Sequence, residues 1–87
     1  MIIAVKHKIN NPENFWASAQ KHLPNLPEKG VTRVLQVMPN PTMTEATCVW
    51  EAENIEQLDN YLREKVQDWS HDEYHEINMT NASGLTV

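Results

Sequence analysis

The order of six short periodic segments constrains this chain more than any other feature of its sequence. Alternation of apolar and polar residues predicts a strand, whereas apolar residues at steps of three and four predict an amphipathic helix. In chain order the segments read strand, helix, strand, strand, helix, strand. They cover residues 2–9, 12–23, 31–38, 43–51, 55–69 and 73–80. The 87 residues are expected to form one domain, residues 1–87, with a polar tail from about residue 80.

Local signals mark the ends of both predicted helices. Asn11 is predicted to cap the first helix, with Pro12 at its first position, and Pro24 ends that helix. Asn54 is predicted to cap the second helix and to form a capping box with Gln57, three residues later. Both helices should therefore begin at defined residues.

The short link between the two middle strands decides the topology. Pro39, Asn40 and Pro41 leave room only for a tight connection, so these strands form a hairpin. Because crossovers between parallel strands are right-handed, the order of elements predicts the split βαβ arrangement of ferredoxin-like folds. We therefore predict an α+β domain with a four-stranded antiparallel sheet, strand order 4-1-3-2, and both helices on one face.

Charge and cysteine content exclude several classes of function. Twelve Asp and Glu residues against seven Lys and Arg give a net charge of −5, which argues against nucleic acid or an anionic membrane as a partner. No apolar run approaches the ~20 residues that span a bilayer, and the N-terminal segment lacks the charge pattern of a signal peptide. Cys48 is the only cysteine, so no intramolecular disulfide can form. These features predict a cytoplasmic protein.

Both faces of the predicted sheet carry apolar residues, although two helices can cover only one face. In the second strand, alternation places Val31, Leu35 and Val37 on one face and Val34 and Met38 on the other. In the third strand it places Val49 on one face and Ala46, Cys48 and Trp50 on the other. An uncovered apolar face favours association. We therefore predict a homodimer that packs sheet to sheet, with a monomer that carries scattered surface apolar residues as the alternative.

The segment CVWEAENIEQLDNYL, residues 48–62, joins an aromatic residue and an acid at the end of the third strand to a capped helix. Together with the order of elements and the two-sided sheet, it resembles the dimeric α+β barrel superfamily over Ile2 to about Thr80. The resemblance implies relatives that include cofactor-free monooxygenases similar to those of antibiotic biosynthesis, isomerases, haem-handling enzymes and stress-responsive barrels. It also implies that Trp50 lines a substrate pocket. Ala46 departs from the asparagine that such monooxygenases often carry, which argues against their chemistry here.

Histidines gather near the end of the chain, in the segment SHDEYHEINM of residues 70–79. On a strand, His71, Glu73 and His75 would share one face. Matching like residues across the first and fourth strands aligns Ile3 with Met79, Val5 with Ile77, His7 with His75 and Lys6 with Glu76. This register predicts that two imidazoles, His7 and His75, lie side by side.

Three interpretations of this cluster follow from the residue types. In the first, His7 and His75 bind a small ligand, with Trp50 and Trp16 as aromatic walls of the pocket. In the second, His7, His71 and His75 bind a metal ion. In the third, the histidines cover a solvated strand end and the tryptophans are core residues.

The function predicted from the sequence is binding of a small apolar or aromatic molecule by a homodimeric α+β barrel. A cofactor-free enzyme similar to a monooxygenase or an isomerase is a candidate, and no cofactor is expected. The alternatives are a metal-binding protein and a non-catalytic assembly module. Cys48 is expected to be an inert buried thiol, because nothing near it in the sequence would lower its pKa.

Overall fold

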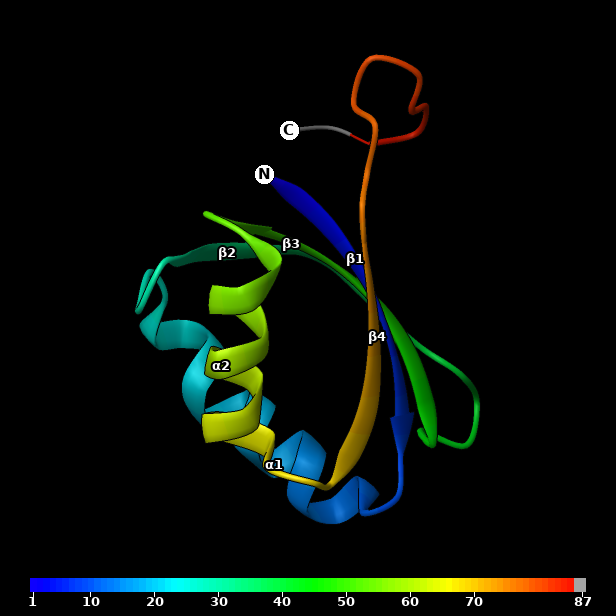
Figure 1. Ribbon diagram of the computed structural model, residues 1–87. Coiled ribbons are helices and arrows are strands. Elements are labelled where there is room, and N and C mark those ends of the chain that lie inside the picture. The colour runs from blue at the N-terminus through cyan, green and yellow to red at the C-terminus, as the bar shows by residue number, and fades with distance from the viewer. Residues whose placement is uncertain (86–87) are drawn as a thin grey trace.

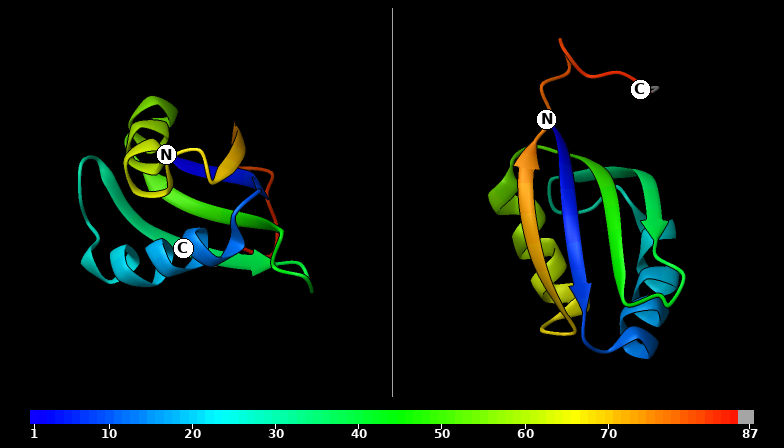
Figure 2. Two further views of the ribbon diagram at one scale, coloured as in Figure 1. Left: turned by 90° about the horizontal axis from the view of Figure 1, so that it is seen from below. Right: turned by 90° about the vertical axis from the view of Figure 1, so that its right-hand side faces the viewer.

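A computed structural model describes residues 1–85 and confirms the predicted order of elements (Figure 1). The elements are β1 (Ile2–Ile9), α1 (Pro12–His22), the short 3-10 helix η1 (Leu23–Asn25), β2 (Val31–Pro39), β3 (Glu45–Ala52), α2 (Ile55–Val66) and β4 (Ser70–Glu76). The sheet is antiparallel with order β2-β3-β1-β4, which is the predicted 4-1-3-2 order. The right-hand view of Figure 2 shows both helices behind one face of the sheet. The chain therefore has the ferredoxin-like α+β fold. The last two residues of the predicted tail, 86–87, lie outside the described residues.

Asparagine caps begin both long helices, as predicted. Asn11 Oδ1 accepts a hydrogen bond from the Asn14 backbone N–H at 3.1 Å, and Asn54 Oδ1 accepts one from the Gln57 N–H at 2.8 Å. The predicted capping box is only half formed, because Gln57 Oε1 is buried without a partner. That side chain packs instead against Gly30, where a Cβ atom would clash with it. No helix among residues 1–85 is long and apolar enough to cross a membrane.

The core lies between the sheet and the helices, and β1 supplies its centre. The alternation of β1 points every second side chain toward the helices, so Ile3 and Val5 are fully buried. His7 occupies the next place in this inward row and is 1% exposed. The strand therefore carries an ionisable ring into a largely apolar core.

Two β-bulges in β2 change the faces that alternation predicted. The pairing with β3 shifts after Val31 and again after Val34. As a result Val31, Val34 and Val37 all pair with inward-facing residues of β3, namely Ala52, Trp50 and Cys48. The prediction that set Val34 apart from Val31 and Val37 was wrong, because it assumed an unbroken alternation. Met38 and Val49 remain as apolar residues on the helix-free face.

The last strand begins three residues earlier than predicted. We expected a strand over residues 73–80, whereas β4 spans Ser70–Glu76. The helix α2 ends at Val66, and the Trp69 carbonyl accepts hydrogen bonds from the backbone N–H groups of Asn10 and Asn11. These bonds tie the turn after α2 to the end of β1, so pairing starts directly after the turn.

The earlier start changes the register between β1 and β4. The structure pairs Ile3 with Glu76, Ala4 with His75, Lys6 with Glu73, His7 with Asp72 and Lys8 with His71. The predicted register, with His7 beside His75, is therefore wrong. Because the difference is an odd number of residues, it moves His75 to the opposite face of the sheet. His71, Glu73 and His75 thus share a face, as predicted, but it is the helix-free face.

Candidate functional site

A small apolar cavity lies between the sheet and the two helices. Its wall includes Phe15 and Trp16 of α1, Cys48 and Trp50 of β3, and Tyr61 of α2, and its volume is about 30 Å³. This is room for one or two water molecules. Pockets for drug-sized ligands measure roughly 300–1,000 Å³. The structure therefore shows the cavity in a closed form.

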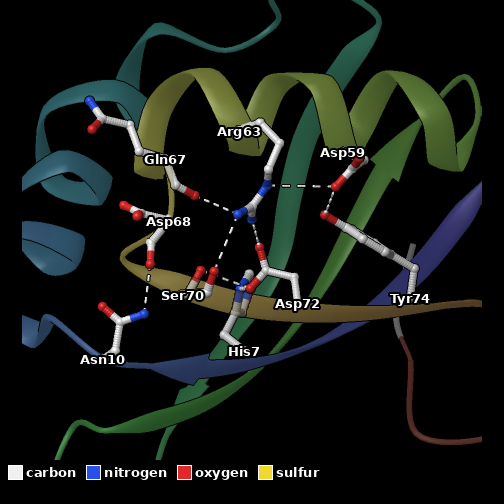
Figure 3. A network of polar contacts seen from close by, with 9 residues as sticks. All are labelled: His7, Asn10, Asp59, Arg63, Gln67, Asp68, Ser70, Asp72 and Tyr74. Atoms are coloured by element: carbon white, nitrogen blue, oxygen red, sulfur yellow. Dashed lines mark hydrogen bonds and ion pairs between the residues drawn. The ribbon is translucent and has the colours of Figure 1, made fainter.

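His7 lines this cavity and forms a buried pair with Asp72 (Figure 3). The two residues are cross-strand partners of β1 and β4, and both side chains are 1% exposed. The Nδ1 atom of His7 lies 2.6 Å from Oδ1 of Asp72. A contact this short between buried polar groups fixes the orientation of the imidazole ring.

Asp72 is held by hydrogen bonds from three side chains. Besides His7, the Ser70 hydroxyl donates to Oδ1 at 2.8 Å, and the Arg63 guanidinium donates to Oδ2. Burial alone would raise the pKa of Asp72, but the hydrogen bonds from His7 and Ser70 and the positive charge of Arg63 oppose it, and this pKa lies below its usual range. Asp72 is therefore an anion at neutral pH and can only accept. The proton shared with His7 resides on Nδ1.

Two buried polar atoms on the cavity wall lack partners. His7 Nε2 and Trp50 Nε1 have no hydrogen bond among the described residues, and both side chains line the cavity. With Nδ1–H donating to Asp72, the neutral imidazole leaves Nε2 as an acceptor, whereas the indole N–H is a donor. Each unsatisfied buried group costs about 1–3 kcal/mol. Two residues of the wall thus carry one unused acceptor and one unused donor.

Arg63 connects the buried pair to the surface of α2. Its guanidinium donates to the carbonyls of Gln67 and, at 3.2 Å, Ser70, and its Nε lies 3.6 Å from Asp59 Oδ1. The Tyr74 hydroxyl donates to the same Asp59 oxygen at 2.7 Å (Figure 3). The Arg63 side chain is 38% exposed, so the network runs from solvent to the buried carboxylate.

Aromatic rings make up most of the remaining wall. Phe15 meets the His7 ring edge-on at 5.3 Å between centroids and the Trp16 ring at 4.9 Å. Trp50 meets Tyr61 edge-on at 6.1 Å. Such T-shaped pairs are favourable beyond the area that they bury. They give the cavity rigid, apolar sides.

The side of the cavity toward α1 and β2 is less deeply buried. Val37 of β2 lines it and is 39% exposed, and the Trp16 indole N–H donates to the Met43 carbonyl at 2.9 Å in the loop between β2 and β3. Lys65 also lines the cavity, and its ammonium group lies 2.8 Å from Glu28. The positive charge nearest the cavity is therefore already paired.

Cys48 contributes a free, buried thiol to the wall. Burial raises the pKa of this thiol to about 12, despite the opposing effect of a backbone contact at Met38. At neutral pH the group stays a thiol and is a poor nucleophile. This agrees with the inert cysteine expected from the sequence.

The structure brings together three of the four residues predicted to bind a ligand. Trp50, Trp16 and His7 line the same cavity, whereas His75 is exposed on the other face of the sheet. The alternative metal set of His7, His71 and His75 is divided between the two faces, so these residues do not meet. Within residues 1–85 no group of three or more His, Cys, Asp or Glu side chains could hold a metal ion.

Sequence reasoning missed Asp72, Ser70 and Arg63. One signal was present: a strand that starts at Ser70 places Ser70, Asp72 and Tyr74 on one face. An acid between such neighbours must find a partner, because an isolated buried charge is costly. His7, the polar residue of the inward row of β1, was the available partner.

Comparison with known proteins assigns no family to this chain. No protein-family model matches the chain, and no curated protein sequence matches it significantly. A solved structure described as "Putative antibiotic biosynthesis monooxygenase from Nitrosomonas europaea" is similar, with 12% sequence identity and a TM-score of 0.49. The similarity covers 90% of this chain and 99% of that one.

Proposed function

We propose that this chain binds a small, mainly apolar molecule that carries one O–H or N–H group, in the cavity between sheet and helices. The observation that supports this is His7 Nε2, a buried acceptor without a partner in an apolar wall. A guest that donates a hydrogen bond to Nε2 would remove the cost of leaving this buried acceptor unpaired, which is about 1–3 kcal/mol. The rest of the guest would pack against Trp16 and Trp50.

A guest must enlarge the cavity before it can bind. About 30 Å³ does not hold an aromatic ring. The side toward solvent is lined by Val37 and by the half-buried Trp16 and Leu23. We therefore expect entry between α1 and β2, with α1 moving outward.

For a catalytic activity we propose an isomerase-like enzyme of the cytoplasm that works by proton transfer. A positioned histidine is the side chain most often used as a general base. A monooxygenase-like activity is the second candidate, supported by the match of Trp50 to the sequence resemblance. Ala46 stands where such monooxygenases often carry an asparagine, which argues against a monooxygenase-like activity.

We also propose that two copies pack through their helix-free faces. That face carries Lys6 and Lys8 on β1, between the acids Glu45 of β3 and Glu73 of β4. Within residues 1–85 none of these four forms an ion pair, so their charges are available to a partner. Under a two-fold axis the basic row of one copy can meet an acidic row of the other. Met38, which is 48% exposed, would be covered in such a dimer.

Phenol and toluene test the binding proposal, because they share a shape and only phenol can donate a hydrogen bond. Calorimetric titration should show that the wild type binds phenol about tenfold more tightly than toluene, which corresponds to about 1.4 kcal/mol. His7→Leu should abolish this preference, whereas His75→Leu, on the other face, should keep it. Binding of neither compound would refute the proposal and favour a non-catalytic assembly module.

A further inference from the structure

We propose that His7 is a general base that takes a proton from the molecule in the cavity, and that Asp72 and Arg63 are positioning residues for it. This inference rests on the proposed binding function and deepens it. The substrate class is an enolisable carbonyl compound, and the reaction is a 1,3-proton shift. Such a reaction needs no oxidant and no second substrate.

The contacts of His7 fix which nitrogen can act. Asp72 can only accept, so Nδ1 carries the proton of the 2.6 Å contact and Nε2 carries the lone pair. Arg63 and Ser70 hold the carboxylate, so neither it nor the ring is free to turn. Nε2 is buried on the cavity wall and makes no hydrogen bond within residues 1–85. The unused lone pair therefore belongs to a residue of the cavity wall, and nothing in the described chain competes for it.

The charges around His7 favour transfer of a proton from a substrate to its imidazole ring. Arg63 donates to the Asp72 carboxylate, and a neutral His7 adds no further charge beside that buried anion. When Nε2 takes a proton, the imidazolium lies 2.6 Å from the Asp72 carboxylate, which stabilises it. The new anion lies beside the new cation, which limits the cost of charge separation in an apolar cavity.

The proton transfer can be written with full balance. The C–H bond next to a carbonyl breaks, its electron pair forms the enolate, and the proton makes an N–H bond at Nε2. His7 then returns the proton to a different atom of the same delocalised anion, so the product is an isomer of the substrate. The Trp50 indole N–H, a donor without a partner on the same wall, is available to the enolate oxygen.

Other ionisable residues on the wall are poorly suited to act as the base. Burial raises the pKa of Cys48 to about 12 and also raises the pKa of Tyr61, so neither ionises readily. Lys65 is paired with Glu28 at 2.8 Å. His22 of α1 is the one other imidazole among the described lining residues, and no carboxylate is paired with it there.

The probe for this inference is 4-nitrophenol, which is a weak acid that is yellow only when ionised. Equilibrium dialysis measures how much of it binds, and absorbance measures how much of the bound probe has lost its proton. In the wild type, bound probe should be ionised at a pH where free probe is mostly neutral. Its acid dissociation constant should rise about tenfold or more, which is one pKa unit.

Two variants remove the base in different ways. His7→Gln should still bind the probe but leave it neutral. In Asp72→Asn, Arg63 should hold the amide oxygen, so the NH₂ group faces Nδ1 and the imidazole proton moves to Nε2. This variant should also leave the probe neutral, and it provides the test should His7→Gln fail to fold by circular dichroism. The matched control His75→Gln, on the other face, should behave as wild type. In His22→Gln, within the cavity wall, the probe that binds should still be ionised.

The outcomes separate the two proposals. Wild-type protein that binds the probe in its neutral form would overturn the base and leave the binding proposal standing. Loss of ionisation in His22→Gln but not in His7→Gln would also overturn it. If wild-type protein binds no probe, while phenol binding fails as well, the cavity is not a binding site and both proposals fall.

Discussion

Replacing Asp72 with leucine removes the anion to which three side chains donate. His7 is 1% exposed, so its Nδ1–H loses its only partner and cannot reach water, which costs about 1–3 kcal/mol. Ser70 is 3% exposed and its hydroxyl loses a bond worth about 1 kcal/mol. Arg63 is 38% exposed and can be solvated again, so its share stays below about 1 kcal/mol. The expected loss of unfolding free energy is about 3 kcal/mol.

Urea denaturation followed by tryptophan fluorescence measures this loss. With a slope of about 1–3 kcal/mol per M, the midpoint should fall by about 1–3 M without a change in slope. Glu53→Leu is the control, because Glu53 is an exposed acid that forms no ion pair within residues 1–85. Its effect should stay within about 0.5 kcal/mol.

A double variant tests whether the cost comes from the unpaired imidazole. Leucine at both 7 and 72 leaves no buried donor from this pair, so the double variant should be at least about 1 kcal/mol more stable than the sum of the two single losses predicts. A loss below about 1 kcal/mol in Asp72→Leu, or simple additivity in the double variant, would show that the buried pair does not stabilise the fold as reasoned here.

Three further predictions concern pH, thiol reactivity and assembly. The pKa of Asp72 is lower in the folded than in the unfolded chain, so its contribution to the free energy of unfolding is present above about pH 3.9, the unfolded pKa. This contribution is lost as the pH falls through the folded pKa. Acid titration by circular dichroism should show this loss of stability, and the loss should be smaller in Asp72→Asn. Cys48 should react with a disulfide reagent at neutral pH only after urea unfolds the chain, and fast reaction of folded protein would contradict the buried thiol. Light scattering should give about twice the 10.1 kDa chain mass, and Lys6→Glu with Lys8→Glu should give a monomer; a monomeric wild type at high concentration would exclude the proposed dimer.

Periodicity and caps were sufficient to predict the fold from the sequence. The alternation of β1 and the asparagine caps of α1 and α2 are local features that depend on neighbouring residues, and the structure keeps them all. The order of elements then restricted the topology, because crossovers have a fixed hand. Local alternation also placed His7 on the same face as Ile3 and Val5, whereas Trp50 was selected from the resemblance to the dimeric α+β barrel superfamily.

The register between strands that are distant in the sequence could not be predicted from local patterns. The start of β4 depends on hydrogen bonds from Asn10 and Asn11 to the Trp69 carbonyl, which no local pattern reveals. An error of three residues exchanged the faces, so His75 replaced Asp72 as the expected partner of His7. The first bulge of β2 had the same effect on Val34, because an added residue reverses the side chains that follow, and the second bulge restored the predicted face by Val37.

Trp16 belongs to two parts of the molecule at once. Its ring lines the cavity, while its N–H binds the Met43 carbonyl in a loop that Asn40 braces, by accepting bonds from the backbone N–H groups of Thr44 and Glu45 at 2.9 and 3.0 Å. A guest that pushes the ring aside must first break its bond to the hairpin. In the proposed binding site the hairpin tip would therefore be a kinetic gate, and loosening it at Asn40 should speed both entry and escape of a guest.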